Sequence, residues 1–481
     1  MNFKFVTLGL TFIFSLTKAI DSCTLPDARP ASINRTFISS SIDAAIESLR
    51  PRFIDPNMGT LFSNSLPNSL DTTILYHSNE SFQEDSFVIT GDIPAMWLRD
   101  STNQFWPYLR FVANDTSLQS LFRGLIRRQT ANVLKQPYAN AFQINGSIAG
   151  PHKDDNVYPK GSNTNWTFEL KWEADSLSNT LRLASAYYNA TGDTSSFDDS
   201  WYASVLVIIQ VFKDQQRGSV EEDDVFGIKY AFQRNTEEPS DSLEHGRGAP
   251  ANSGTGLIKC GFRGSDDALL LPFNIPENAF AASALTSIAS LLTVLQYTDT
   301  ATDAIELSSQ IRAGIYKYGI IANHSITGKS VFAYEIDGFG NQIFMDDANI
   351  PGLLSMPYYN FIDVNDPLYL NTRAALMSNK SNPYWISGSA GEGIGGPHNG
   401  WPWIWPMAIT TRAYTSTSDA EIATQLEMLV NSSACTGFIH ESFNKNNVTI
   451  FTRPWFAWAN SQFADLVLKV IDERPHLILK S

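Results

Sequence analysis

The sequence predicts an all-α toroid, and three observations support this fold class. Apolar residues at helical spacing occur in paired segments joined by short turns, along several hundred residues. The strand-like runs between these pairs are brief. No linker rich in Pro, Gly or Ser divides the chain, so a single domain is expected over residues 20–481.

The elements can be justified in order along the chain. A helix is expected over 39–49, where apolar residues follow the helical spacing and Pro51 ends it. Residues 72–76 and 86–90 are rich in β-branched and aromatic side chains and predict short strands. Pro276 and Pro454 suit the first turn of a helix. The remaining helices are expected over 100–112, 117–134, 172–188, 195–212, 277–297, 302–318, 367–378, 403–414, 419–430 and 454–470.

Four long connections are rich in Gly, Asp, Asn and His. They cover 136–169, 225–275, 330–366 and 381–402. Long structured loops in a compact domain usually carry function. Short β-hairpins are expected within them, with Asp337-Gly338 as the clearest turn signal.

Composition excludes several classes of function. The net charge is -15, and no run of Lys and Arg could follow a phosphate backbone, so nucleic acid is not an expected partner. No CxxC or HExxH pattern occurs, and neither a metal nor another cofactor is expected. The three cysteines allow one disulfide, for which Cys260 with Cys435 is the expected pairing.

The N-terminus predicts entry into the secretory pathway. Residues 1–19 read as a signal peptide, with Lys4 before an apolar centre and small residues before the cut. A signal anchor is the alternative. No later stretch is long and charge-free enough to span a membrane. Ten Asn-x-Ser/Thr sequons support a secreted glycoprotein: Asn34, Asn79, Asn114, Asn145, Asn165, Asn189, Asn323, Asn379, Asn431 and Asn447.

The first chemical cluster lies in residues 91–109. Asp92, Arg99 and Asp100 stand among apolar residues with Trp97, and buried charges need partners. A polyhydroxylated ligand is one such partner. A structural helix start, with the charges paired in the core, is the alternative.

Two further clusters contain neighbouring acids. Glu173 and Asp175 are two apart, so a helix would point them to nearly opposite sides, and either could instead complement the helix dipole. Asp266 and Asp267 are adjacent, and their repulsion predicts a raised pKa for one of them, as a general acid requires. Arg263 opposes this effect, and Asp266 could instead cap a turn.

The last two clusters combine acids, amides and aromatic residues. Asp346, Asp347 and Asn349 lack the spacing and distal Glu of a calcium loop, so no metal is assigned to them. Near the C-terminus, His398 precedes an alternation of tryptophans suited to stacking on sugar rings. Glu441 lies between apolar residues, where burial could tune it for acid-base work; a surface ion pair is the alternative.

Taken in order, these motifs resemble glycoside hydrolase family 125, the exo-α-1,6-mannosidases. The resemblance rests on GDIPAMWLRDSTNQ, WEADSL, GFRGSDDA, YEIDGFGN, MDDANIPGLLS, GPH, HESF and FTRPWFAWANS, which run from Gly91 to Asn460. It implies an (α/α)6 barrel, inversion at the anomeric carbon and no need for a metal. The Trp-rich run before Trp405 is unusual for the pattern, and Gly264 stands where proline is expected.

The resemblance also implies roles for individual residues. The general acid is in the Asp266–Asp267 pair, with Asp267 favoured, and Glu441 matches the general base. The residues matched to the surroundings of the terminal mannose are Asp92, Trp97, Arg99, Asp100, Asp175, Arg263, Asp346, Asp347, Asn349, His398, Arg453 and Asn460. Asn278, which follows the cluster that begins at Cys260, is a further candidate for binding the sugar.

The expected partners are α-mannoside oligosaccharides, from either a mannan or an N-glycan. Two rival functions remain open at this point. One is a secreted mannan-binding protein without turnover, and the other is an (α/α)6 exo-hydrolase of different specificity, such as a glucoamylase-like enzyme.

Overall fold

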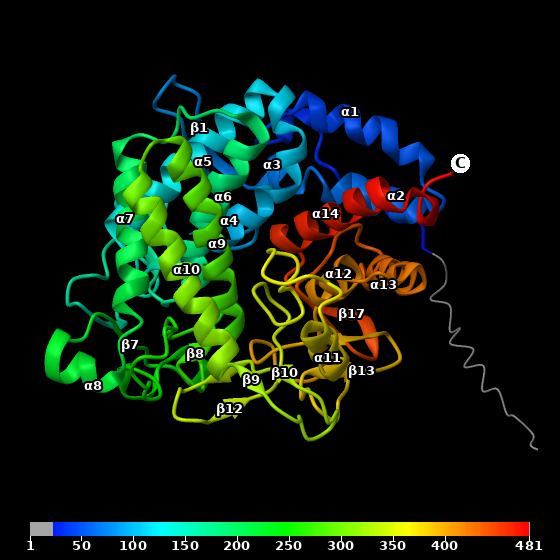
Figure 1. Cartoon of the computed structure of the whole chain (residues 1–481). Coiled ribbons are helices and arrows are strands. Elements are labelled where there is room, and N and C mark those ends of the chain that lie inside the picture. The colour runs from blue at the N-terminus through cyan, green and yellow to red at the C-terminus, as the bar shows by residue number, and fades with distance from the viewer. Residues whose placement is uncertain (1–22, 481) are drawn as a thin grey trace, which may run out of the picture.

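The computed structural model describes residues 23–480, so the predicted signal peptide lies outside the described residues (Figure 1). The described chain is helix-rich. Its α-helices are α1 (Ser40–Leu49), α2 (Pro56–Ser65), α3 (Asn68–Thr72), α4 (Leu98–Phe105), α5 (Thr116–Lys135), α6 (Ala174–Thr191), α7 (Asp199–Asp214), α8 (Ser219–Glu221), α9 (Ile275–Val294), α10 (Thr298–Tyr318), α11 (Pro367–Leu376), α12 (Pro406–Tyr414), α13 (Asp419–Ser432) and α14 (Ala457–Glu473). Within the described residues, no helix is both long and apolar enough to cross a membrane.

All strands belong to small sheets of two or three strands. The antiparallel pairs are β1 (Ile74–Ser78) with β2 (Asp85–Val88), β9 (Ile320–Ile321) with β10 (Val331–Phe332), β13 (Trp385–Ser387) with β14 (Glu392–Ile394), and β5 (Asn156–Tyr158) with β7 (Ala231–Gln233). The three-stranded sheets are β3 (Met96–Trp97), β4 (Ala141–Phe142) and β6 (Thr167–Glu169); β12 (Gln342–Ile343), β11 (Glu335–Ile336) and β8 (Phe273–Asn274); and β15 (Trp403–Ile404), β16 (Ser442–Asn444) and β17 (Asn447–Thr452).

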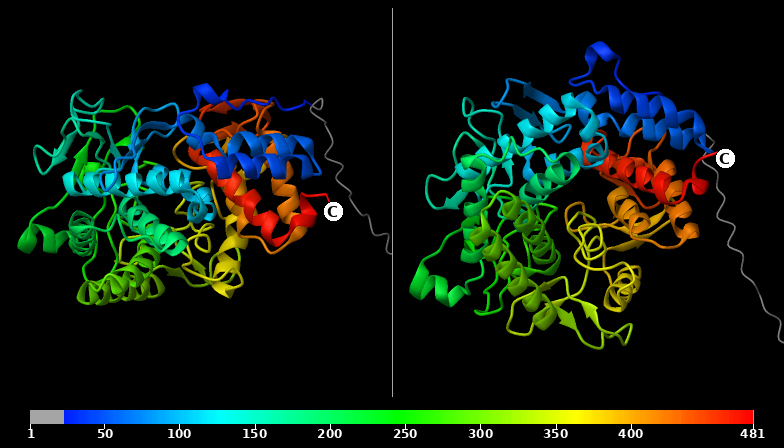
Figure 2. Two further views of the ribbon diagram at one scale, coloured as in Figure 1. Left: turned by 90° about the horizontal axis from the view of Figure 1, so that it is seen from above. Right: turned by 45° about the horizontal axis from the view of Figure 1, so that its top comes forward.

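The helices follow one another around the molecule. The colours in the right view of Figure 2 run once round it, and the C-terminal α14 ends beside α1 and α2. Helix α14 packs against α4, α4 against α6, and α6 against α9, while α12 packs against α14. Helices α5, α7 and α10 pack outside this inner group. Accordingly, α9 is buried on nearly every side, whereas α10 keeps a polar outer face.

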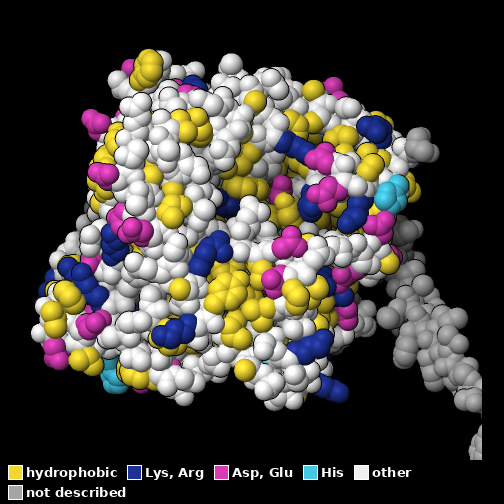
Figure 3. All heavy atoms as spheres, viewed as in Figure 1, with side chains coloured by type: hydrophobic (Ala, Val, Ile, Leu, Met, Phe, Trp, Pro, Cys, Tyr) yellow, Lys and Arg dark blue, Asp and Glu magenta, His cyan; other side chains and the backbone are white. Residues whose placement is uncertain are grey.

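An irregular segment over 350–361 lies between α9 and α12. The Tyr359 hydroxyl donates to the backbone carbonyl of Pro276 at 3.4 Å, and the Tyr358 ring packs edge-on against Tyr414 at 4.8 Å between centroids. This segment therefore contacts both inner helices without itself being helical. Acidic and basic side chains are interspersed on the face shown in Figure 3.

Most predicted helices are confirmed, with differences at their ends. The predicted helix over 100–112 is wrong beyond residue 105, because Pro107 lacks an amide hydrogen and a 3-10 turn follows. The predicted start at 403 is also wrong, since Trp403 belongs to β15 and α12 begins at Pro406. Helix α2 was not predicted, because it is short, is buried from Met58 to Ser65, and contains a glycine and several Asn and Ser residues, which favour helices weakly.

The expected Cys260–Cys435 disulfide is wrong. Cys435 is bonded to Cys23, and Cys260 is a buried free thiol. The bridge joins residues 412 apart and ties the start of the described chain to the turn after α13. Spacing along the sequence could not distinguish these pairings, because disulfide geometry depends on Cα atoms brought together by the fold.

Candidate active site

Most of the chemical clusters lie in segments that lead into the N-terminus of an inner helix, and this brings them together. Strand β3 leads directly into α4, β8 into α9, and β15 into α12, while residues 171–173 precede α6 and 439–456 precede α14. The free amide groups at helix N-termini carry partial positive charge and stabilise carboxylates. This end of the inner helices therefore suits a cluster of acids.

Arg99 is the central cation of this cluster. Its Nη1 lies 2.7 Å from Glu173 Oε2 and 3.7 Å from Asp175 Oδ2, and its Nη2 lies 2.9 Å from Asp266 Oδ1. Its Nε lies 3.3 Å from the Asp100 carboxylate. The guanidinium is almost completely buried, so these acids are the partners that its charge requires.

The expectation that Glu173 and Asp175 face opposite sides is wrong, and the reason is local. Glu173 has extended backbone angles (φ -132°, ψ 128°) and is the N-cap of α6, which begins at Ala174. Glu173 lies outside the helix, so the rotation of about 200° expected between two helical residues at this spacing does not separate the side chains. Both carboxylates reach Arg99. Asn140 extends the cluster by donating to Glu173 Oε1 at 3.3 Å and to Asp266 Oδ1 at 3.2 Å.

Burial raises the pKa of several of these acids. It raises the pKa of Asp175 to about 7 and that of Asp100 to about 6, although Arg99 acts in the opposite direction. Burial also raises the pKa of Glu173 well above its ordinary value. Among the described residues, neither oxygen of the Asp175 carboxylate has a hydrogen-bond donor. Strongly perturbed acids of this kind gather at functional sites.

The expected raised pKa within the Asp266–Asp267 pair is wrong, because each residue has its own cationic partner. Burial acts to raise the pKa of Asp266, but the charge of Arg99 and a hydrogen bond with Glu173 outweigh it and hold that pKa well below its usual value. For Asp267, the effect of burial is outweighed by His398, and its pKa is also lowered. His398 Nδ1 lies 3.2 Å from Asp267 Oδ2.

Glu441 lies at the end of a buried stretch, immediately before β16. Its Oε2 accepts a hydrogen bond from the Thr452 hydroxyl at 2.9 Å, and its Oε1 lies 3.6 Å from Arg453 Nη1. Arg453 Nε also donates to Asp92 Oδ1 at 2.9 Å. The glycine Gly91 makes this contact between the two ends of the chain possible, since its φ is 129° and a Cβ there would lie 2.3 Å from the Trp455 carbonyl oxygen.

His398 brings the two candidate catalytic groups into one electrostatic environment. Burial lowers its pKa, but the hydrogen bond and charge of Asp267, with the charges of Glu441 and Asp266, outweigh this and raise the pKa to about 9. Asp267 contacts the imidazole directly, and Asp266 and Glu441 contribute to the raised pKa through their charges, although Glu441 lies 174 positions after Asp267 in the sequence.

The loop over 345–349 closes another side of the cluster. The Ser265 hydroxyl donates to Asp347 Oδ2 at 2.7 Å, and Asp347 Oδ1 accepts from the Asn349 amide at 3.1 Å. Arg263 is buried and lies 3.1 Å from Glu335 Oε1 in β11. Gly264, which replaces the expected proline, has its Cα facing the Ile350 carbonyl; a Cβ there would lie 3.2 Å from that oxygen.

Some predicted site residues support the site without facing it. Asn278 binds the backbone of Ile258 through both ends of its amide, and Asn460 binds the backbone of Ile439 in the same way. Both carboxylate oxygens of Asp346 accept backbone amides, and burial raises the pKa of Asp346 to about 7. Trp97 is buried against Phe168. The structure thus gives these four residues scaffold contacts.

Sequence reasoning missed other residues of the cluster. Glu277 is buried beside Asp175, whose backbone N–H donates to Glu277 Oε2 at 2.6 Å. Lys171 is buried and pairs with Glu169 and Asp241. A charged residue next to a predicted helix start was a usable signal for both. Asn140 had no such signal.

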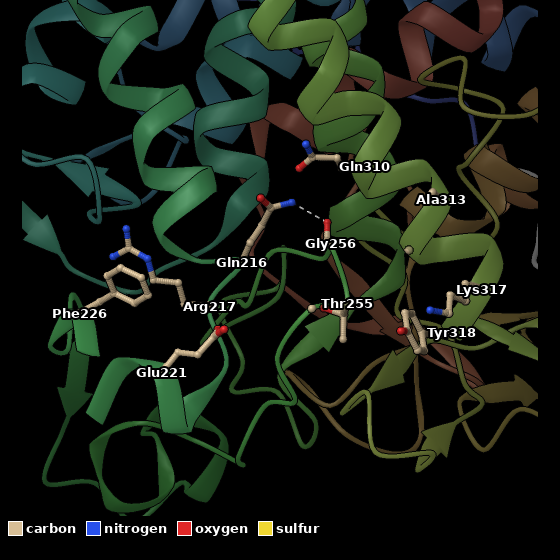
Figure 4. Close-up of a pocket in the computed structure, with 12 residues that line it drawn as sticks. Gln216, Arg217, Glu221, Phe226, Thr255, Gly256, Gln310, Ala313, Lys317 and Tyr318 are labelled. Carbon is tan, nitrogen blue, oxygen red and sulfur yellow. Dashed lines mark hydrogen bonds between the residues drawn. The ribbon is translucent and has the colours of Figure 1, made fainter. Parts of the chain in front are cut away.

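A shallow hollow of about 580 Å³ lies elsewhere, on the outer side between α10 and the segment after α7 (Figure 4). Its lining includes Arg217, Phe226, Gln310 and Lys317, with Glu221 as its one acid. General acid and base catalysis on a glycoside requires two carboxyl groups. The hollow therefore is not the candidate catalytic centre.

Comparison with protein families gives a match to the metal-independent alpha-mannosidases, GH125, over residues 55–468. The chain belongs to glycoside hydrolase family 125. The resemblance identified from the sequence motifs is thereby confirmed, and membership makes the cluster around Arg99 the candidate active site of an α-mannosidase.

Individual relatives agree with this assignment. The meiotically up-regulated gene 157 protein of Schizosaccharomyces pombe is 42% identical over 468 residues, covering 95% of this chain and 91% of that protein. A metal-independent α-mannosidase of Streptococcus pneumoniae, solved in a non-productive complex with α-1,6-mannobiose, matches with a TM-score of 0.84 and 34% identity, covering 91% of this chain and 100% of that chain. A bacterial glucoamylase complexed with acarbose matches with a TM-score of 0.54 and 11% identity, covering 90% of this chain and 57% of that chain, which concerns the fold alone.

Proposed function

We propose that this protein is a secreted exo-acting α-1,6-mannosidase that releases terminal mannose with inversion of configuration. One observation carries the proposal: in a member of this family, Asp267 is bound to His398, Asp266 to Arg99, and Glu441 lies 3.6 Å from Arg453, near the N-terminal ends of the inner helices. The family relative bound to α-1,6-mannobiose supports the choice of linkage.

Glu441 is the general base in this proposal. Its carboxylate takes a proton from a water molecule that attacks the anomeric carbon. Thr452 and Arg453 orient the two oxygens, and Glu441 is only 4% exposed. An inverting reaction requires room for this water, which corresponds to a carboxyl separation of about 6.5–9.5 Å against roughly 5–5.5 Å in retaining enzymes.

Asp267 is the general acid in this proposal, and the different partner cations of the two neighbours support this choice. Arg99 remains charged at all accessible pH values, so a proton on Asp266 would abolish its ion pair. His398 can release its proton to Asp267. Exclusion of water by a bound sugar favours the neutral His–Asp pair over the ionic one, because a low dielectric disfavours charge. Asp267 then carries the proton for the leaving oxygen.

We also infer that the helices of the described residues form an (α/α)6 toroid, with the segment over 350–361 in place of one inner helix. The contacts of α14 with α2 and α4, which join the two ends of the helix order, support a closed ring. The position of this segment between α9 and α12 supports its place in that ring.

Secretion is proposed from the leader and the sequons. All ten sequon asparagines are exposed, as attachment of a glycan requires. Treatment of the secreted protein with an N-glycan-removing enzyme should lower its apparent mass, and the mature chain should begin near Ile20 or Asp21. A protein that keeps Met1 and shows no mass shift would refute secretion.

The decisive experiment is hydrolysis of a panel of linkage-defined manno-oligosaccharides, with α-linked glucosides beside them. Release of mannose from the α-1,6 linkage only is expected, with β-mannose appearing first in proton NMR. Glu441→Gln should reduce turnover by about 10²–10⁴-fold. Asp267→Asn should lose more activity on natural mannosides than on aryl mannosides with acidic phenols. Binding without turnover would instead favour the mannan-binding alternative, and cleavage of glucosides the glucoamylase-like one.

A further inference from the structure

Trp401 differs from the other tryptophans of this protein. The chain has eleven, all within the described residues, and Trp401 is the one whose side chain is mainly exposed, at 63%. A single exposed apolar residue needs no explanation by itself. The position of Trp401 and the contacts that hold its ring do require an explanation.

The loop over 395–402 joins Trp401 to the segments that carry both candidate catalytic groups. His398, which contacts Asp267, lies three residues away, a chain length of at most about 11 Å. On the other side, the backbone N–H of Lys445 donates to the Pro402 carbonyl at 3.2 Å. Trp403 pairs with Asn444 in the sheet whose central strand begins directly after Glu441. Trp401 therefore stands at the rim of the candidate active site.

The indole ring is held in place on one face. The Lys445 ammonium lies 4.0 Å from the ring centroid, a cation–π contact, and Lys445 is at the turn between β16 and β17. The remaining exposed surface of the ring is available to a ligand. Aromatic rings bind the apolar faces of flat organic groups through dispersion and exclusion of water.

We infer that Trp401 is a platform for the sugar on the leaving-group side of the scissile bond, and so determines preference for oligosaccharides over simple mannosides. This inference rests on the proposed function. The terminal mannose would lie at the cluster of acids near His398, and the next sugar would stack on Trp401 at the edge of that cluster. Trp401 is thus a specificity-determining residue, since it contacts the aglycone and takes no part in proton transfer.

The test compares substrates with and without a leaving-group sugar. Trp401→Ala should lower kcat/KM for α-1,6-mannobiose about tenfold, mainly through KM, and leave α-mannosyl fluoride within about twofold, because fluoride makes no contact with the platform. Trp401→Phe should retain most of the activity on mannobiose. Phe226→Ala is the matched control, since Arg217 lies over its exposed ring at the same 4.0 Å, but on the outer side of the molecule.

The outcomes separate the inference from the proposed function. Equal losses on mannobiose and on the fluoride would make Trp401 structural, and unchanged kinetics on both would refute a platform. If the wild type cleaves neither substrate, the proposed function fails. Calorimetric titration of mannobiose and of mannose into the unmodified protein and Trp401→Ala then decides the inference alone: weaker binding of the disaccharide only would support it, and equal binding would overturn it.

Discussion

Replacement of Arg99 by Met should destabilise the protein strongly, and more at alkaline than at acidic pH. The guanidinium contacts Glu173, Asp266, Asp100 and Asp175 at 2.7–3.7 Å in a buried site. Removing one partner of a buried ion pair typically costs about 3–5 kcal/mol, because the remaining charge stays unpaired. Partial protonation of acids whose pKa values are about 6 and 7 limits this cost at neutral pH.

The pH dependence follows from the direction of the pKa changes. Asp266 has a lowered pKa in the folded state, so its ion pair contributes stability above the unfolded pKa of about 4, and that contribution is lost as pH falls. Without Arg99, the pKa of each neighbouring acid rises, and each unit costs about 1.4 kcal/mol at pH values above it. The difference between wild type and Arg99→Met should therefore increase from pH 5 to pH 8.

Urea-induced unfolding at the two pH values measures this difference. Arg110→Met is the control, because Arg110 and Asp472 form an exposed pair whose removal should cost at most about 1 kcal/mol. If Arg99→Met does not fold, Arg99→Lys, which keeps the charge but loses the two-pronged geometry, should show a smaller loss with the same pH trend. A variant as stable as Arg110→Met at pH 8 would refute Arg99 as the central cation.

Three further predictions concern His398, Gly91 and the disulfide. His398 has a pKa of about 9, so its protonated form stabilises the protein below pH 6.5, and this contribution disappears as pH rises through 9. His398→Gln should therefore lower the free energy of unfolding mainly at the lower pH. The alkaline limb of the kcat/KM profile of this variant should move to lower pH. Gly91→Ala should destabilise by roughly 1–3 kcal/mol more than Gly161→Ala, since both glycines have positive φ but only Gly91 has a carbonyl oxygen in the path of a Cβ. Thiol labelling should modify Cys260 alone, and only after unfolding, and Cys23→Ser should lower the free energy of unfolding by about 2–4 kcal/mol.

Helices with one solvent-exposed side were predicted closely. The amphipathic α5 and α10 begin and end within a few residues of their predicted limits, because periodic burial leaves a periodic pattern. The buried α9 was also predicted, because Pro276 marks its start, whereas the buried α2 contains a glycine and several Asn and Ser residues that favour helices weakly. The small sheets before α4 and α12 depend on pairing between distant segments, which a local pattern does not contain.

The candidate site was predictable as a set of residue types but not as a set of contacts. Asp266 and Asp267 stood out as a pair in the sequence. The structure shows that their partners differ, because Asp266 binds Arg99 and Asp267 binds His398. Glu173 was left out of the predicted site because a helix over both residues would point it away from Asp175. In the structure, Glu173 is the N-cap of α6 and lies outside that helix. Asn278 and Asn460 were included by their motifs, although both amides bind backbone. Motifs identify positions, whereas only the fold assigns the direction of each side chain.

The separation of the two aspartates has a chemical consequence for the proposed reaction. Asp266 has a φ of 67°, a conformation outside regular strand or helix, and it lies against Arg99 while Asp267 lies against His398. A carboxylate held ionised by a permanent cation is suited to stabilising the positive charge that develops on the sugar ring. A carboxyl group paired with an imidazole can gain and lose a proton within one turnover. Two adjacent residues of the same type can therefore serve opposite roles, because one is bound to arginine and the other to histidine.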